Sequence, residues 1–186
     1  MKTNHTSLLR VTTTAVMIAF TCVLTMAVRI PSPTKGYLNL GDVAVLLSGW
    51  LLGPVYGPVA AGIGSALADL FSGYPVYAPA TLLIKAAMAL AVAVIPARFA
   101  GGEKRRLRLG FMLGAVFAEL LMTAGYYLYE ATVIGEGFYA AFLGVPGNAV
   151  QGAVGAAGAY LLIELLGRTD FFKTFGARGF LKGRVK

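Results

Sequence analysis

Long apolar runs alternate with short polar or basic connections along this sequence. One stretch of 26 residues without a charged residue runs from Val43 to Ala68 and lies between Asp42 and Asp69. A helix needs about 20 apolar residues to cross a bilayer, and hydrophobic residues make up 58% of the chain. The pattern predicts an all-α integral membrane protein with a single membrane domain, residues 1–186. Six transmembrane helices are predicted, at residues 8–30, 40–52, 56–71, 79–97, 109–129 and 145–166.

Two Gly-Pro pairs, beginning at Gly53 and Gly57, interrupt the uncharged run from Val43 to Ala68. Proline disrupts the interior of a helix, so a turn here would divide the run into the second and third spans. The second span would have about 13 residues and rise about 20 Å, which is short of a hydrocarbon core of about 30 Å. A single kinked span over residues 43–68 is the alternative that hydropathy leaves open.

The basic residues predict the orientation of the chain, whose net charge is +8. With six spans, thirteen Lys and Arg residues fall on one side of the membrane, in the N-terminal segment, the 98–108 loop and the tail. Two, Arg29 and Lys35, fall on the other side. Cytoplasmic loops carry an excess of Lys and Arg, so we expect cytoplasmic N- and C-termini and a basic cytoplasmic tail at residues 167–186. One kinked span with an outside N-terminus gives the same count, so charge alone does not fix the number of spans.

Few residues in this chain are suited to catalysis or metal binding. The one cysteine, Cys22, lies inside an apolar run, and the one histidine, His5, precedes the first span. A single cysteine forms neither an intramolecular disulfide nor a thiolate metal site by itself. The sequence also lacks a phosphate-binding loop of the G-x-x-x-x-G-K-[S/T] kind. We therefore expect no enzyme activity, no catalytic residue, no metal and no cofactor. The basic residues flank apolar runs, which argues against a nucleic-acid partner.

Asp69, Lys85 and Glu119 are ionisable residues inside predicted spans. A charge at the middle of a membrane costs on the order of 3 kcal/mol on insertion scales, so each of the three is a candidate functional residue. Lys85 lies about 9 Å and Glu119 about 15 Å below the outer ends of their helices. A lysine stem can cover the difference in depth, so a Lys85–Glu119 pair is feasible.

Polar side chains in the last three spans share helical faces near the outer ends of those spans. The spacing is i, i+3, i+4 or i+7, which places residues on one side of a helix. These stripes are Thr81, Lys85 and Met88; Glu119, Thr123, Tyr126 and Glu130; and Asn148 and Gln151. They predict a cavity open to the outside, with apolar walls and a few directed polar groups. The candidate aromatic walls are Trp50, Tyr74, Tyr77 and Tyr126.

Three stretches together resemble the substrate-binding (S) component of energy-coupling factor (ECF) transporters, the vitamin uptake systems of prokaryotes. The resemblance covers about residues 10–166. The stretches are Ala15-x-x-x-Ala19 in the first span; Leu40-Gly41-Asp42 followed by the Gly-Pro turn and the segment from Gly64 to Leu70; and the segment from Tyr77 to Lys85 that opens the fourth span.

The resemblance implies six spans, a multi-pass location in a prokaryotic plasma membrane, and a capture mechanism. An S component takes a vitamin from outside into a pocket capped by loops, and then topples while docked on a transmembrane coupling subunit. Two ATPase subunits drive release. Ala15 and Ala19 would contact the coupling protein. The expected substrate-binding residues are Lys85, Glu119, Tyr126, Asn148 and Gln151, with Asn39, Asp42, Tyr74 and Tyr77 helping the loops to close.

Only Ala15, Ala19, Asp42 and Lys85 in this set follow from the family pattern, and the other residues are inferred from helical faces. The nearest subgroup is that of hydroxymethylpyrimidine, a thiamine precursor, or of pyridoxine-type vitamins, with riboflavin binders as neighbours. A stand-alone carrier in which Glu119 relays protons is the main alternative. A purely structural partner of another complex is a further one.

Overall fold

The computed structural model describes residues 2–99 and 104–167, and these are mostly helical. Five of the described helical segments are long and apolar enough to cross a membrane: Ser7–Ala27, Gly41–Phe71, Ala78–Phe99, Arg108–Thr132 and Gly137–Leu166. The elements in order are α1 (Lys2–Ala27), β1 (Arg29–Pro31), β2 (Tyr37–Asn39), α2 (Gly41–Phe71), α3 (Ala78–Val94), the 3-10 helix η1 (Pro96–Phe99), α4 (Lys104–Thr132), α5 (Gly137–Phe142) and α6 (Val145–Gly167). Apart from Gly167, the predicted basic tail lies outside the described residues.

Helix α2 consists of two halves that meet at Gly53. Gly53 has φ 77° and ψ −168°, a conformation that glycine adopts readily and other residues do not. Pro54 follows at the start of the second half, where a missing N–H is no loss. A Cβ placed on Gly57 would lie 2.8 Å from the Cα of Gly49, although these residues would be about 12 Å apart in a continuous helix. The chain therefore reverses direction here, while the six membrane crossings remain a prediction.

A short β-hairpin, residues 29–39, connects α1 to α2 where the sequence predicted only a loop. The strands β1 and β2 pair antiparallel, with Arg29 opposite Asn39 and Pro31 opposite Tyr37. At the end of the hairpin, the Asn39 side chain accepts a hydrogen bond of 2.8 Å from the N–H of Gly41. Such a local bond favours a turn and begins α2. Two further segments differ from the predicted spans, because α4 continues past residue 129 to Thr132 and the connection to α6 contains α5.

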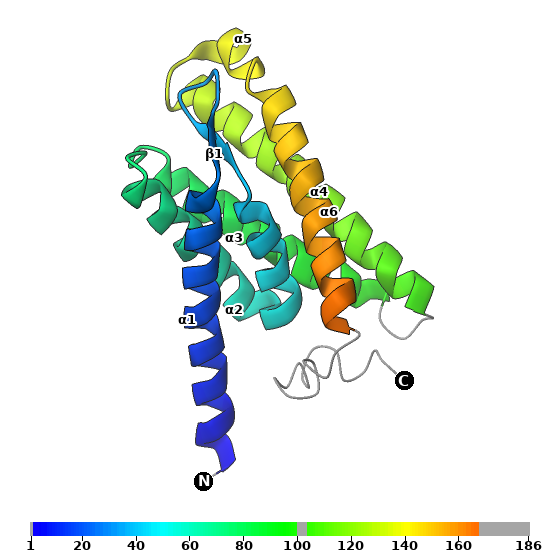
Figure 1. The fold of residues 1–186 in the computed structure, drawn as a ribbon. Coiled ribbons are helices and arrows are strands. Elements are labelled where there is room, and N and C mark those ends of the chain that lie inside the picture. The colour runs from blue at the N-terminus through cyan, green and yellow to red at the C-terminus, as the bar shows by residue number, and fades with distance from the viewer. Residues whose placement is uncertain (1, 100–103, 168–186) are drawn as a thin grey trace.

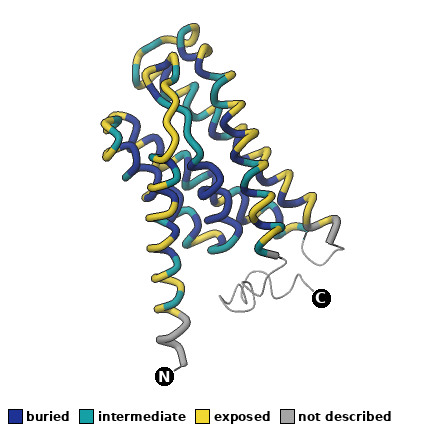
Figure 2. Tube along the Cα trace, in the orientation of Figure 1, coloured by how far each residue is buried: buried dark blue, intermediate teal, exposed yellow. Residues whose placement is uncertain are grey.

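The helices are arranged so that the hairpin and α5 lie at one end of the bundle (Figure 1). The beginning of α1, the end of α6, η1 and the beginning of α4 lie toward the other end. Buried residues concentrate where α2 and α3 pack together (Figure 2). The core includes Trp50, which is 1% exposed and makes an edge contact with Phe111 at 5.2 Å between ring centroids. Trp50 is thus a core residue and not the pocket wall that we expected.

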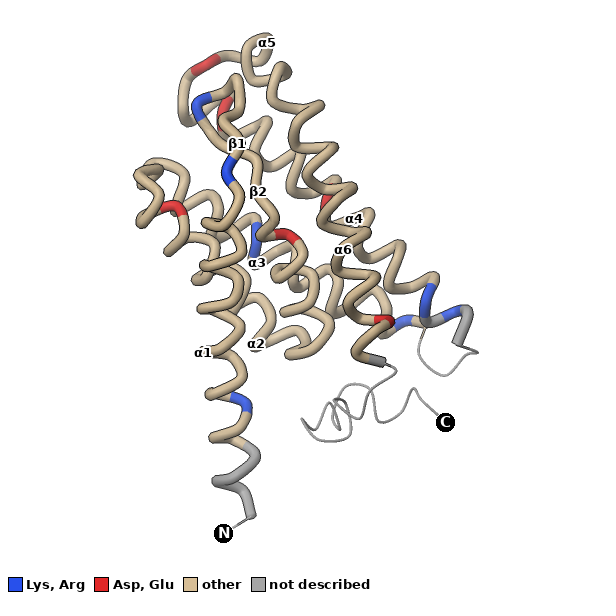
Figure 3. The backbone as a smooth tube through the Cα atoms, viewed as in Figure 1, with Lys and Arg blue, Asp and Glu red and all other residues tan. Residues whose placement is uncertain are grey.

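Large apolar side chains cover the outer surface of the bundle. Five of them, on four different helices, are each more than half exposed: Val16, Leu83, Leu120, Val150 and Leu161. Soluble monomers rarely expose apolar surface on this scale, whereas a lipid-facing surface requires it. Charged residues lie mostly toward the two ends of the bundle (Figure 3). The surface therefore fits a bilayer, and the few charges inside the bundle are the exceptions.

The close contact between the halves of α2 predicts the effect of a larger side chain at Gly57. We expect Gly57→Leu to reduce the free energy of unfolding by about 1–3 kcal/mol, because the Gly49 backbone and the Ser48 carbonyl would have to move. Thermal unfolding in detergent, followed by the fluorescence of the only tryptophan, Trp50, measures this. The control is Val59→Leu at a position that is 44% exposed on the same half-helix. Equal unfolding midpoints for both variants would contradict the close contact.

Candidate functional site

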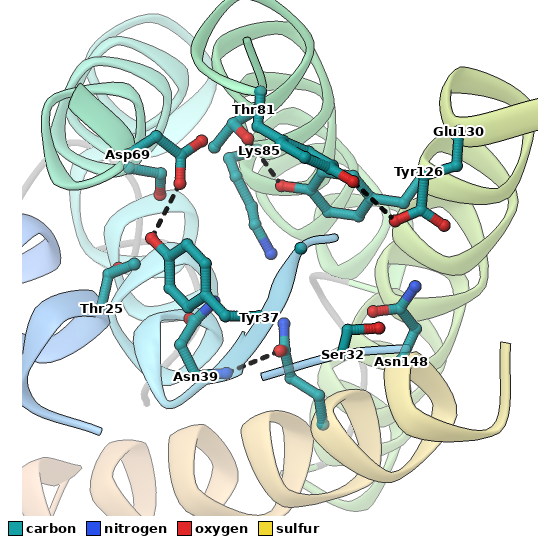
Figure 4. A pocket seen from close by; sticks show the side chains of 14 residues that line it. Thr25, Ser32, Tyr37, Asn39, Asp69, Thr81, Lys85, Tyr126, Glu130 and Asn148 are labelled. Atoms are coloured by element: carbon teal, nitrogen blue, oxygen red, sulfur yellow. Dashed lines mark hydrogen bonds between the residues drawn. The ribbon is translucent and has the colours of Figure 1, made fainter. Parts of the chain in front are cut away.

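A polar cavity lies under the hairpin, between α2, α3, α4 and α6 (Figure 4). Six of the nine predicted substrate-binding residues line it: Asn39, Tyr77, Lys85, Tyr126, Asn148 and Gln151. Thr81 and Glu130, which belong to the predicted polar stripes, also line it. The other lining residues are Thr25, Ser32, Gly36, Tyr37, Ser65 and Asp69, which were in neither set. Asp42, Tyr74 and Glu119 are not among the lining residues.

The cavity measures about 30 Å³. A buried water needs about 10–15 Å³ on this measure, so the cavity has room for roughly two waters and not for a vitamin. Four of its lining residues, Ser32, Gly36, Tyr37 and Asn39, come from the hairpin. Movement of the hairpin is therefore the simplest way to enlarge the space.

A buried ion pair forms the floor of the cavity. The Lys85 ammonium donates a hydrogen bond to Oδ1 of Asp42 and lies 3.1 Å from Sδ of Met122. Asp42 is completely buried and Lys85 is 2% exposed. The amide nitrogen of Gln151 donates to the other Asp42 oxygen at 2.6 Å, and its amide oxygen accepts from the N–H of Asn39 at 2.8 Å. This network joins α2, α3, α6 and the hairpin.

The expected pair between Lys85 and Glu119 does not form. Lys85 pairs instead with Asp42, because the first turn of α2 carries Asp42 directly into the bundle beside α3. Both carboxyl oxygens of Glu119 are buried and have no hydrogen-bond partner within the part of the chain that the structure describes. They lie against α6, where a Cβ on Gly152 or on Gly155 would approach them to 3.0 or 3.1 Å. The two glycines thus provide the space that Glu119 occupies.

Two further carboxylates lie closer to the cavity mouth and hold the hairpin. The Tyr37 hydroxyl donates to Oδ1 of Asp69 at 2.8 Å. The Thr34 hydroxyl donates to Oε1 of Glu130 at 2.9 Å, and the Tyr77 hydroxyl donates to the Thr34 carbonyl at 2.6 Å. The sequence identified Asp69 as an ionisable residue inside a span and Glu130 as part of a polar stripe. No sequence pattern indicated that Tyr37 and Thr34 are their respective hydrogen-bond partners.

Tyrosines form one wall of the site. The ring of Tyr37 lies 4.6 Å from that of Tyr74, and Tyr77 lies 6.5 Å from Tyr126. Burial, followed by the nearby Asp69 carboxylate, raises the pKa of the Tyr37 hydroxyl well above its usual value. Burial, followed by Glu130, does the same to the pKa of Tyr77. Both hydroxyls therefore keep their protons at neutral pH and act as donors.

The remaining candidate residues are on α1. Ala15 and Ala19 are both exposed on this helix, one turn apart, where a partner helix has access to them. Among the described residues, no group of three or more His, Cys, Asp or Glu side chains is placed to hold a metal ion. The chemistry that the cavity offers is thus hydrogen bonding, charge and ring contacts.

The ion pair between Asp42 and Lys85 predicts unequal effects of single and double substitution. We expect Asp42→Ala to lower the free energy of unfolding by about 3–5 kcal/mol, because Lys85 would remain buried without a partner. In the double variant Asp42→Ala/Lys85→Met no uncompensated charge remains, so this protein should unfold at a higher temperature than the single variant. Thermal unfolding of both variants checks this, and a double variant no more stable than Asp42→Ala would count against the pair.

Comparisons with known proteins agree with this architecture. A solved structure described as "Structure and mechanism of the S component of a bacterial ECF transporter" matches with a TM-score of 0.67 and 25% identity, covering 88% of this chain and 97% of that one. A Pyrococcus woesei protein described as "Uncharacterized protein in gap 3'region" is 41% identical over 116 residues, which are 62% of this chain and 74% of that protein.

The sequence profile of one family extends over almost the whole chain. The family is described as "ECF-type riboflavin transporter, S component", and its profile matches residues 5–168. S components are the substrate-binding subunits of ECF transporters and are not enzymes, and they work with a membrane-embedded coupling subunit and ATPases. The chain belongs to the family of ECF-type riboflavin transporter S components.

Proposed function

We propose that this protein captures a small water-soluble vitamin from outside a prokaryotic cell and delivers it through an ATP-driven ECF importer. Riboflavin is the first candidate substrate, because the matching family carries its name. The hydroxymethylpyrimidine and pyridoxine types that the sequence favoured are the next candidates. The observation that carries the proposal is a cavity lined by polar side chains within a bundle whose outer surface is apolar.

The hairpin end of the bundle faces the outside in this proposal. The two predicted outside cations, Arg29 and Lys35, belong to that end, in β1 and in the turn that follows it. Arg98 lies in η1, and Arg106 and Arg108 lie near the beginning of α4, toward the opposite end. An excess of basic residues marks the cytoplasmic side. The proposed number of crossings is six, with each half of α2 crossing separately.

A second candidate function is a stand-alone proton-coupled carrier. It is favoured by Glu119, an acidic residue that is 8% exposed and whose carboxyl oxygens have no hydrogen-bond partner among the described residues. Proteoliposomes that contain this chain alone separate the two functions. Uptake that follows an imposed proton gradient supports the carrier, whereas uptake that requires the coupling subunit, the ATPases and ATP supports the ECF importer.

A substitution at Asn148 should weaken ligand binding with little effect on folding. It lines the cavity from α6 and is only half-buried. We expect Asn148→Ala to weaken binding of the cognate vitamin about tenfold, which corresponds to about 1.4 kcal/mol and to the loss of a hydrogen bond. Isothermal titration of the purified chain measures this. The control is Val150→Ala on the exposed side of α6, and equal affinities for the two variants would remove Asn148 from the site.

Substitutions at Ala15 and Ala19 should impair transport without changing the affinity for the vitamin. We expect Ala15→Trp to leave vitamin affinity within twofold of the unsubstituted protein and to stop uptake by the assembled importer, because a large ring prevents close approach of a partner helix. Affinity is measured on the isolated chain, and uptake in proteoliposomes with the ECF module. Leu120→Trp on the exposed side of α4 is the control. Normal uptake by the Ala15→Trp protein would refute the assignment of this face to the coupling subunit.

A further inference from the structure

Asp69 and Glu130 lie on opposite sides of the cavity and form a pair of acceptors for a ligand (Figure 4). Each is more than nine-tenths buried, with exposures of 4% and 3%. In each carboxylate one oxygen accepts a hydroxyl from the hairpin. The second oxygen of each, Oδ2 of Asp69 and Oε2 of Glu130, has no hydrogen-bond partner in the described part of the chain. Buried acceptors of this kind are costly unless a donor reaches them.

Four of the donors around the cavity are already committed to protein atoms. The Tyr37 hydroxyl donates to Asp69, and the Tyr77 hydroxyl donates to the Thr34 carbonyl. The Lys85 ammonium is held by Asp42, and the Gln151 amide nitrogen donates to the same carboxylate. The Asn148 amide and the Ser65 hydroxyl also line the cavity and can donate to a ligand. The second oxygens of Asp69 and Glu130 can only accept, so the ligand must supply the donors that bind them.

The charged residues that line the cavity also favour a ligand that donates hydrogen bonds and carries no negative charge. Asp69, Lys85 and Glu130 are the only charged residues among the lining residues described. The one cation, Lys85, is neutralised by the buried Asp42 carboxylate. Two carboxylates consequently face the space without a matching positive charge. A phosphate group would bring further negative charge and acceptor oxygens next to these carboxylates. Repulsion between like charges would therefore weaken the binding of a phosphate ester relative to the free compound.

We propose that the cavity selects an uncharged or cationic ring compound that carries several hydrogen-bond donors, and that it rejects the phosphate ester of the same compound. The inference rests on the proposed function, because it specifies the substrate class of the same cavity. Hydroxyl or amino groups of the ligand bind Asp69 and Glu130, as the hydroxyls of Tyr37 and Thr34 do here. Tyr77 and Tyr126, with ring centroids 6.5 Å apart, provide aromatic surface for a planar ring.

The test compares matched pairs of free vitamins and their phosphate esters on the purified full-length chain. The probes are riboflavin and riboflavin 5′-phosphate, pyridoxine and pyridoxine 5′-phosphate, and hydroxymethylpyrimidine and its phosphate ester. Isothermal titration gives each affinity. We expect one free vitamin to bind, and its ester to bind at least tenfold more weakly. An ester that binds as tightly as its vitamin overturns the inference and leaves vitamin capture standing. A cooperatively folded protein that binds none of the six probes overturns the proposed function itself.

Substitution of Asp69 and Glu130 tests whether these two carboxylates cause the preference for the free vitamin over its phosphate ester. In Asp69→Asn/Glu130→Gln the negative charges are lost while the side-chain shapes are kept, so the preference for the free vitamin should fall to less than threefold. Glu164→Gln is the matched control, because Glu164 pairs with Arg108 away from the cavity and should leave the preference unchanged. A preference that persists in the double variant overturns the role of these carboxylates. The single variants Asp69→Asn and Glu130→Gln provide the same comparison where the double variant does not fold.

Discussion

The ion pair between Asp42 and Lys85 is the interaction on which the arrangement of this membrane bundle depends. An unpaired ammonium inside a bilayer is unfavourable, and removing one partner of a buried pair is more harmful than removing both. Asp42 begins α2 directly after the hairpin, and Lys85 lies in α3. Gln151 then extends the pair to α6 and, through the N–H of Asn39, to the hairpin. One network of hydrogen bonds therefore fixes three helices and the hairpin at the same depth.

The polar residues of the cavity form two groups with different roles. In the floor group, which consists of Asp42, Lys85 and Gln151, the charges and the amide are paired with one another within the protein. In the rim group, which consists of Asp69 and Glu130, each carboxylate depends on a hydroxyl of the hairpin and has a second oxygen without a partner among the described residues. A satisfied polar network is rigid, whereas a partly satisfied one gains from a new donor. The floor is thus suited to holding the helices, and the rim is suited to exchanging partners with a ligand.

Helical periodicity predicted a substantial part of this site, because residues three, four or seven apart on a helix share a face wherever the helix lies. That rule brought Tyr126, Asn148 and Gln151 toward one cavity, all of which line it. It failed for the partner of Lys85, because depth in the membrane does not determine which helices are neighbours. The reversal at Gly53 and the approach of α2 to α3 made Asp42 the neighbour, and no local pattern specifies that contact.

The hairpin was less predictable than the helices for a physical reason. Its strands have three residues each, which is too short to show an alternation of polar and apolar positions. Pro31 and the polar residues that follow it are typical of a loop. Its effect is nevertheless large, since Thr34 and Tyr37 donate to the rim carboxylates and four hairpin residues line the cavity of about 30 Å³. A ligand that binds Asp69 and Glu130 must replace or supplement these hydroxyls. Ligand affinity and hairpin position are consequently linked, because both involve the same two carboxylates.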